Sequence, residues 1–120
     1  MKLCLKNLFE KAAEPQTDYA AIARDFKEIA ESPYNVSTNN CMQKAMKLAY
    51  SIQENHGSDV VLVQITHNSG DYRHAFILWQ KDLAVDPTMK PPAYRVDYNE
   101  YLRILAGAGF TKDLEETRQF

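Results

Sequence analysis

The sequence predicts one α+β domain, because helical and strand patterns occupy separate stretches of the chain. Apolar residues recur at helical spacing through the first half, up to about residue 54. A block rich in β-branched residues and turn signals follows, and a further helical pattern comes after it. Segregation of this kind is typical of an α+β fold with an antiparallel sheet, and not of a doubly wound α/β fold.

Three helices are expected in the first half of the chain. The first covers residues 5–12, and the second begins after Asp18, a residue type that caps helix N-termini, and ends at Pro33. The third begins at about 38–40 and runs to about residue 54. Gly57 suits the left-handed position that often follows a helix.

The strands are expected to form an antiparallel meander. Residues 60–65 are β-branched and almost all apolar, as in a central strand. The turn residues at 67–71 predict a hairpin into a second strand over 73–80. A short third strand covers 83–85 and ends at Asp86 before a proline.

One more helix is expected near the C-terminal end. The prolines at 91–92 indicate an irregular crossing, and Asp97 with Glu100 matches a capping box at a helix start. Glycines at 107 and 109 stop this helix, and the polar residues 111–120 are expected to be mobile.

Composition narrows the function classes. A chain of 120 residues has the length of one domain, 1–120, and 45% hydrophobic residues are ordinary for a globular protein. With 14 Lys and Arg against 16 Asp and Glu, the sequence predicts no nucleic-acid partner. No apolar run reaches transmembrane length and only Cys4 and Cys41 could form a disulfide, so we expect a reduced cytoplasmic protein without a membrane partner.

Cys41 is the candidate nucleophile. It falls in the first turn of the third predicted helix, where free N–H groups and the positive end of the helix dipole favour a thiolate. The same N–H groups can hold a developing oxyanion.

His74 and Asp86 are the candidates for base and orienting group. His74 shares a side of its strand with Phe76 and Leu78, a face that we expect to look inward onto the nucleophile helix. Asp86 ends the next strand, where its carboxylate can accept a hydrogen bond from the imidazole. The other histidines, His56 and His67, fall at a helix end and a hairpin tip, where surface positions are expected.

Three segments resemble transglutaminase-like domains, a branch of the papain-like cysteine enzymes. Residues 41–45 (CMQKA) are similar to the nucleophile helix of that family, 73–79 (RHAFILW) to its His-Ala strand, and 86–88 (DPT) to its Asp-Pro-Thr ending. The segments occur in the family order, and the resemblance covers residues 38–88. It implies a papain-like core, a Cys-His-Asp triad and acyl chemistry through a thioester on the cysteine. A protein or peptide would be the substrate and no cofactor is needed.

The resemblance leaves the oxyanion donor open. Family members often carry Gly before the nucleophile, where this chain has Asn40. The upstream donor is commonly an aromatic or amide side chain, and the candidates for it are Tyr34, Asn35, Asn39 and Asn40.

Three other interpretations compete with a peptidase, deamidase or acyltransferase. The chain could be a catalytically inactive binding or inhibitory module on the same scaffold, because fold does not guarantee activity. It could be a structural or assembly protein. A zinc site made from Cys41, His74 and Asp86 is a third alternative, although structural zinc sites usually draw on closely spaced Cys and His pairs, which are absent from the sequence.

Overall fold

The computed structural model describes residues 16–118 and shows an α+β domain. The predicted helix over 5–12 and Cys4 lie outside the described residues. In chain order the described elements are α2 (Tyr19–Glu31), α3 (Cys41–Glu54), β1 (Val60–His67), β2 (Arg73–Trp79), β3 (Leu83–Asp86), β4 (Ala93–Asp97), α4 (Tyr98–Gly107) and β5 (Phe110–Thr117). The α+β class predicted from the sequence is confirmed.

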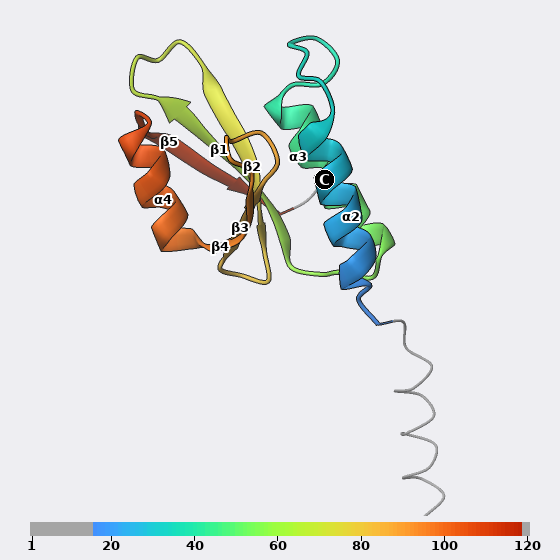
Figure 1. Cartoon of the computed structure of the whole chain (residues 1–120). Coiled ribbons are helices and arrows are strands. Elements are labelled where there is room, and N and C mark those ends of the chain that lie inside the picture. The colour runs from blue at the N-terminus through green and yellow to red at the C-terminus, as the bar shows by residue number, and fades with distance from the viewer. Residues whose placement is uncertain (1–15, 119–120) are drawn as a thin grey trace, which may run out of the picture.

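The strands form a single antiparallel sheet with helices on both faces. The strand order is β4-β3-β2-β1-β5, and each neighbouring pair is antiparallel. Helices α2 and α3 lie on one side of the sheet and α4 on the other (Figure 1). The hairpin between β1 and β2 pairs Val60 with Trp79 at one end and Thr66 with Arg73 at the other.

Side-chain caps define where the helices of the first half begin. The Asp18 carboxylate accepts a hydrogen bond from the Ala21 N–H at the start of α2, as predicted. Asn40 and Gln43 form a reciprocal capping box at the start of α3. The left-handed residue after α3 is His56, with φ 63°, and the prediction that Gly57 takes that position is wrong. Gly57 is needed because a Cβ there would lie 2.3 Å from Cγ2 of Ile52.

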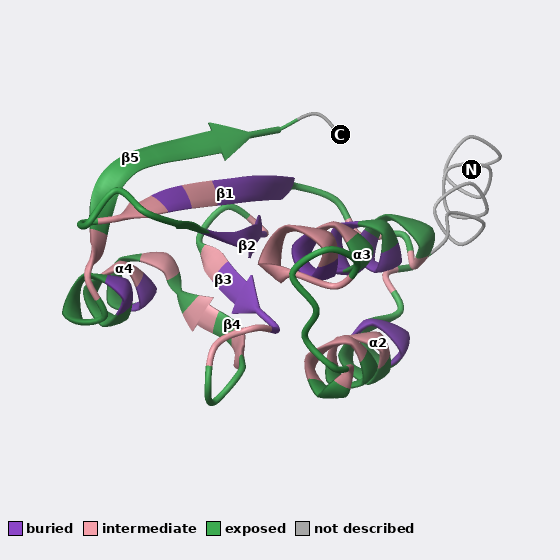
Figure 2. Cartoon of the chain, turned by 90° about the horizontal axis from the view of Figure 1, so that it is seen from above, coloured by how far each residue is buried: buried purple, intermediate pink, exposed green. Residues whose placement is uncertain are grey.

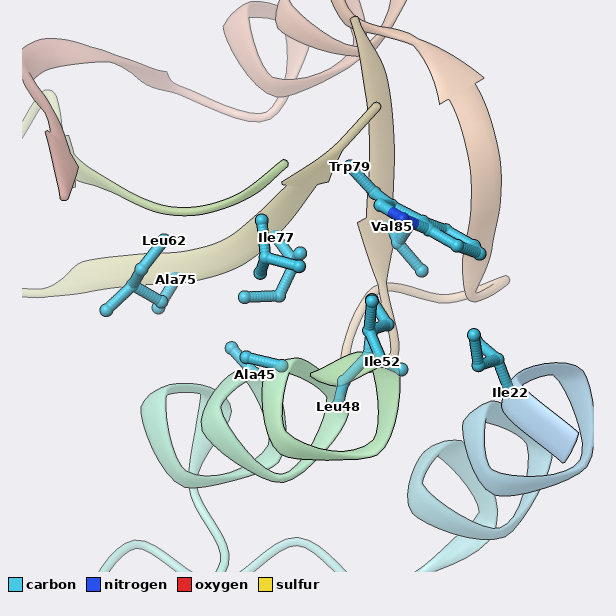
Figure 3. Packing of buried hydrophobic residues seen from close by; sticks show 11 residues of the cluster. Ile22, Ala45, Leu48, Ile52, Leu62, Ala75, Ile77, Trp79 and Val85 are labelled. Atoms are coloured by element: carbon cyan, nitrogen blue, oxygen red, sulfur yellow. The ribbon is translucent and has the colours of Figure 1, made fainter. Parts of the chain in front are cut away.

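The core consists of two layers, one on each face of the sheet. On the α3 face, Leu48 and Ile52 point at apolar side chains of β1 and β2, and Ile22 of α2 joins them at the end near Trp79 (Figure 3). The residues on the α4 face are Val61, Val63, Ile65, Phe76, Leu78, Ala84, Tyr101 and Leu105. Both faces of β1 and β2 are therefore covered, which explains their nearly continuous apolar sequence.

Two strands were not predicted. Residues 93–97 form β4 beside β3, directly after the irregular segment with the two prolines. The expectation of a mobile tail is wrong for residues 110–117, which form β5 along β1. Almost the whole of β5 is exposed at the edge of the sheet, so its polar sequence carries no burial pattern (Figure 2).

Within residues 16–118, the helices are too short or too polar to cross a membrane.

Candidate functional site

The Cys41 thiol lies at a gap in the sheet. Cys41 is the first residue of α3 and is half-buried. Strand β3 pairs with β2 only from Trp79 to Ile77, so among residues 16–118 no strand pairs with that edge of β2 from Arg73 to Ala75. The Cys41 Sγ lies 3.8 Å from the carbonyl oxygen of Arg73 at this uncovered edge. The start of α3 therefore places the thiol beside β2, the strand that carries His74.

His74 lies on the face opposite the one expected. Helix α3 packs on Ala75, Ile77 and Trp79, whereas His74 is on the α4 face, with its ring stacked near Phe76. The prediction that α3 packs across the His74 face is therefore wrong. Because Cys41 approaches the sheet where β3 has ended, its thiol and the imidazole of His74 still line one pocket, and each shifts the pKa of the other.

Asp86 is the most fully bonded member of the site. Its side chain is completely buried at 0% exposure. Its Oδ2 accepts hydrogen bonds from His74 Nε2 and from the Tyr101 hydroxyl. Its Oδ1 accepts from the backbone N–H and the hydroxyl of Thr88, both at 2.9 Å. The Asp-Pro-Thr segment is therefore a turn that satisfies one carboxylate oxygen and leaves the other for the imidazole.

The three titrating groups shift one another. Burial alone would raise the pKa of the Asp86 carboxyl, but the hydrogen bond and charge of His74 lower it below its usual range. Burial alone would lower the pKa of His74, but hydrogen bonds and charges of Asp86 and Cys41 raise it to about 9. The pKa of the Cys41 thiol, which burial raises, is lowered overall by His74 and by backbone N–H groups. These shifts all favour a thiolate beside an imidazolium.

A shallow pocket of about 220 Å³ opens beside the sulfur. We call it the thiol pocket, and it is lined by Tyr34, Val36, Asn40, Cys41, Met42, Gln64, Arg73, His74 and Ala75. The Nε2 of His74 faces Asp86, so its Nδ1 is the ring nitrogen left for the thiol. The Cys41 thiol and the His74 imidazole therefore line one solvent-accessible hollow.

Two of the four oxyanion candidates are placed away from this pocket. Asn35 and Asn39 do not line it. The Asn35 Oδ1 accepts from the backbone of Ser37 and Thr38, and the Asn39 amide donates to Ser32 and to the Pro33 carbonyl. The hydrogen bonds of both side chains therefore stabilise the conformation of the loop before α3.

Tyr34 and Asn40 do line the thiol pocket. The Asn40 amide is occupied, because its Oδ1 accepts from Gln43 N–H and its Nδ2 donates to the Val36 carbonyl. The Asn40 N–H donates to the Gln43 side chain, which leaves the N–H groups of Cys41 and Met42 at the open end of the helix. Asn40 therefore caps the N-terminus of α3, and its side-chain amide is not available to bind an oxyanion.

Two residues of the site were missed from the sequence. Tyr101 lies on α4, and its buried hydroxyl needs a partner, for which Asp86 is the nearby acceptor. Gln64 is the polar residue in the apolar run of β1, on the same side as Leu62, and it lines the thiol pocket. A polar residue that interrupts an otherwise apolar strand is the sequence signal by which Gln64 could have been found.

The other histidines lie away from the thiol pocket. His67 stacks on Tyr72 and meets the edge of Phe110, and His56 is exposed after α3. Neither histidine lines the thiol pocket.

Arg73 lies on the pocket wall and is held by a 2.9 Å ion pair with Glu115.

No group of three or more His, Cys, Asp or Glu side chains in residues 16–118 is arranged to hold a metal ion. The Asp86 carboxylate, in particular, is fully used within the protein, because both of its oxygens accept two hydrogen bonds from protein donors.

In comparisons with known proteins, no family model, no curated protein and no solved structure gives a significant match to this chain.

Proposed function

We propose that the protein is a small cysteine-dependent amide hydrolase or acyltransferase with a papain-like, transglutaminase-like core. One observation carries the proposal: the His74 imidazole lines the same pocket as the Cys41 thiol, and it holds a hydrogen bond to the buried Asp86 carboxylate through Nε2. A nucleophile, a base and an orienting group in that order form the arrangement used for nucleophilic catalysis.

In the acylation step, the Cys41 thiolate attacks the carbonyl carbon of an amide, and the carbonyl π electrons move to the oxygen. The tetrahedral intermediate collapses when the C–N bond breaks, and the His74 imidazolium gives its proton to the departing amine. The products are a thioester on Cys41 and a free amine. The negative charge of Asp86 stabilises the imidazolium before that proton is given up.

In the deacylation step, water or an amine attacks the thioester carbonyl, and neutral His74 takes its proton. The C–S bond breaks and the electron pair returns to sulfur, which restores the thiolate–imidazolium pair. We favour water as the acceptor, because a pocket of about 220 Å³ leaves little room to exclude it. Peptidase or deamidase activity is therefore proposed ahead of cross-linking.

The oxyanion of each intermediate needs hydrogen-bond donors near the thiol. The backbone N–H of Cys41 supplies one, because Asn40 and Gln43 cap the helix without using it. The second donor is the Gln64 amide or the Tyr34 hydroxyl, since both side chains line the thiol pocket. Gln64→Leu and Tyr34→Phe separate the two, because only the loss of the true donor lowers kcat, by about 100-fold.

The proposal is tested by trapping the acyl-enzyme. The protein is mixed with an activated ester such as p-nitrophenyl acetate, and intact and peptide mass spectra locate the added acetyl group. We expect rapid acetylation of Cys41, followed by its slow release, and neither event in Cys41→Ala or His74→Ala. If Cys41 is acetylated no faster than a free thiol, the chain is instead the inactive binding module.

A further inference from the structure

A second and larger pocket lies next to the thiol pocket. It has a volume of about 630 Å³, and we call it the lysine pocket. It is lined by Ala30, Glu31, Ser32, Pro33, Tyr34, Lys44, Pro87, Thr88, Met89, Lys90 and Pro92. The two pockets share Tyr34, and the Thr88 that lines the second one holds the Asp86 carboxylate. A molecule whose amide reaches Cys41 can therefore extend into the lysine pocket.

Lys44, one of the residues that line the lysine pocket, is unusual for a lysine because it is buried. It lies one turn after Cys41 on α3, is only 3% exposed, and its Nζ donates a 2.6 Å hydrogen bond to the Ser32 carbonyl. An ammonium group has three N–H donors, so two remain after this bond. A buried ammonium ordinarily lies beside a carboxylate, since removal from water is costly without a partner.

The surroundings of Lys44 add positive charge. Lys90 lines the same pocket. Burial, together with the charges of Lys47 and Lys90, lowers the pKa of the Lys44 ammonium. Glu31 also lines the pocket, but in residues 16–118 neither Lys44 nor Lys90 forms an ion pair. Among the described residues, the pocket therefore has two cationic side chains that no carboxylate pairs with directly.

We infer that the lysine pocket is a substrate subsite that binds a carboxylate through Lys44 and Lys90, next to the amide that Cys41 attacks. The substrate class is then a peptide that presents a carboxylate near the amide. The link to catalysis rests on the proposed function, whereas the binding of a carboxylate does not. The carboxylate comes from a side chain or from a peptide C-terminus, and the experiment separates these two sources.

The binding test uses full-length Cys41→Ala, which cannot turn the ligand over. Three ligands are titrated and followed by NMR: N-acetyl-glutamate α-amide, N-acetyl-glutamine, and N-acetyl-glutamine α-amide. The first has a side-chain carboxylate, the second has a terminal one, and the third is neutral and nearly isosteric. We expect one of the acids to bind about tenfold more tightly than the neutral ligand, the effect of one charge-assisted hydrogen bond.

Matched variants assign the effect to the pocket. Lys44→Met and Lys90→Met each remove an ammonium group and keep most of the chain length, and both should abolish the preference for the acid. Lys47→Met is the control, because Lys47 is on the same helix but its Nζ bonds to Asn39 and it does not line the pocket. Lys90 follows β3 in a loop, so Lys90→Met keeps the test valid if Lys44→Met fails to fold.

The link to catalysis is tested with the iodoacetyl counterparts of the same three ligands on the wild-type chain. We expect the favoured acid to alkylate Cys41 about tenfold faster than the neutral reagent, with the preference lost in both lysine variants. Fast alkylation by all three at one rate overturns the subsite and leaves the proposed function standing. Slow alkylation by all three overturns the proposed function, and the titration then decides the carboxylate site alone: equal affinity for the three ligands contradicts it.

Discussion

The Tyr101 hydroxyl donates to the same oxygen of Asp86 that faces His74. Helix α4, through Tyr101, and strand β2, through His74, therefore meet at one buried carboxylate oxygen. Although α4 packs on the face of the sheet opposite α3, it helps to position the His74 imidazole. Burial and the neighbouring Asp86 raise the pKa of Tyr101 above its ordinary value, so the hydroxyl is protonated and can donate at neutral pH.

Tyr101→Phe tests this contact. The ring keeps its packing against Phe76, but Asp86 loses one of its donors. We expect the free energy of unfolding to fall by about 1–3 kcal/mol, the cost of one hydrogen bond to a buried charged group. Urea denaturation measures it. Tyr50→Phe is the control, since Tyr50 is 49% exposed, and it should change stability far less. Equal effects in both variants would show that the Asp86 contact contributes nothing.

Asp86→Asn tests the role of the negative charge. The amide keeps the shape of the side chain and can still accept one hydrogen bond, but it no longer stabilises the imidazolium. We expect the pKa of His74 to fall from about 9 toward its ordinary value. NMR titration of the His74 ring measures this. The variant should also react more slowly with thiol reagents at neutral pH, because less Cys41 is thiolate. An unchanged His74 titration would contradict the pairing.

The pH dependence of stability follows from the same pair and is cleanest in Cys41→Ala. The thiol is removed because its lowered pKa makes stability rise with pH below pH 9.0, which would mask the decline caused by His74. A histidine with a raised folded-state pKa stabilises the fold fully below its unfolded value of 6.5. We therefore expect stability to decline as the pH rises above 6.5, over a range that ends below 9 because Cys41 no longer helps to raise the pKa of His74. Asp86, whose pKa is lowered, contributes above 3.8 and loses its contribution as the pH falls below that value.

Urea denaturation across this pH range checks the prediction. The matched variant is Cys41→Ala/His74→Gln, which has no imidazole at position 74 and should show no decline above pH 6.5. The same slope in both variants would mean that another group causes it.

A pair of glycine substitutions tests the packing behind the nucleophile helix. Gly57→Ala places a Cβ 2.3 Å from Ile52 Cγ2, so we expect a loss of about 1–3 kcal/mol from overpacking. Gly107→Ala is the control, because a Cβ there meets nothing within 4 Å and the residue is helical. It should be neutral or raise stability by about 0.5–1 kcal/mol. Thermal unfolding of the two variants measures the difference, and a neutral Gly57→Ala would contradict the close approach.

The elements that could be predicted from sequence are those whose burial leaves a pattern. Helices α2 and α3 and strands β1 and β2 bury a stripe or both faces, and each was expected near its observed position. Strand β5 could not be predicted in this way, because its side chains are exposed and its pairing with β1 comes from backbone hydrogen bonds. A polar edge strand and a polar tail have the same sequence pattern.

For the site, the expected elements that carry Cys41, His74 and Asp86, together with the resemblance to transglutaminase-like domains, pointed to these residues but not to how they meet. The face carrying His74 was assigned to α3 because alternation shows that a face is buried without showing which helix buries it. Tyr101 reaches Asp86 from a helix that follows β4, a contact that depends on where β4 turns the chain. Tertiary placement of this kind has no local sequence signal.

His74 is proposed to hold Cys41 as a thiolate, and the pH profile of Cys41 alkylation is the most direct test of this role. In a Cys4→Ser background, the rate with iodoacetamide is measured from pH 4 to 10 for the parent and for His74→Gln. We expect a parent rate that rises well below pH 9.0, and a variant whose rise moves to higher pH, because only backbone N–H groups then oppose the effect of burial on the thiol pKa. Identical profiles with a midpoint at or above pH 9.0 would contradict it.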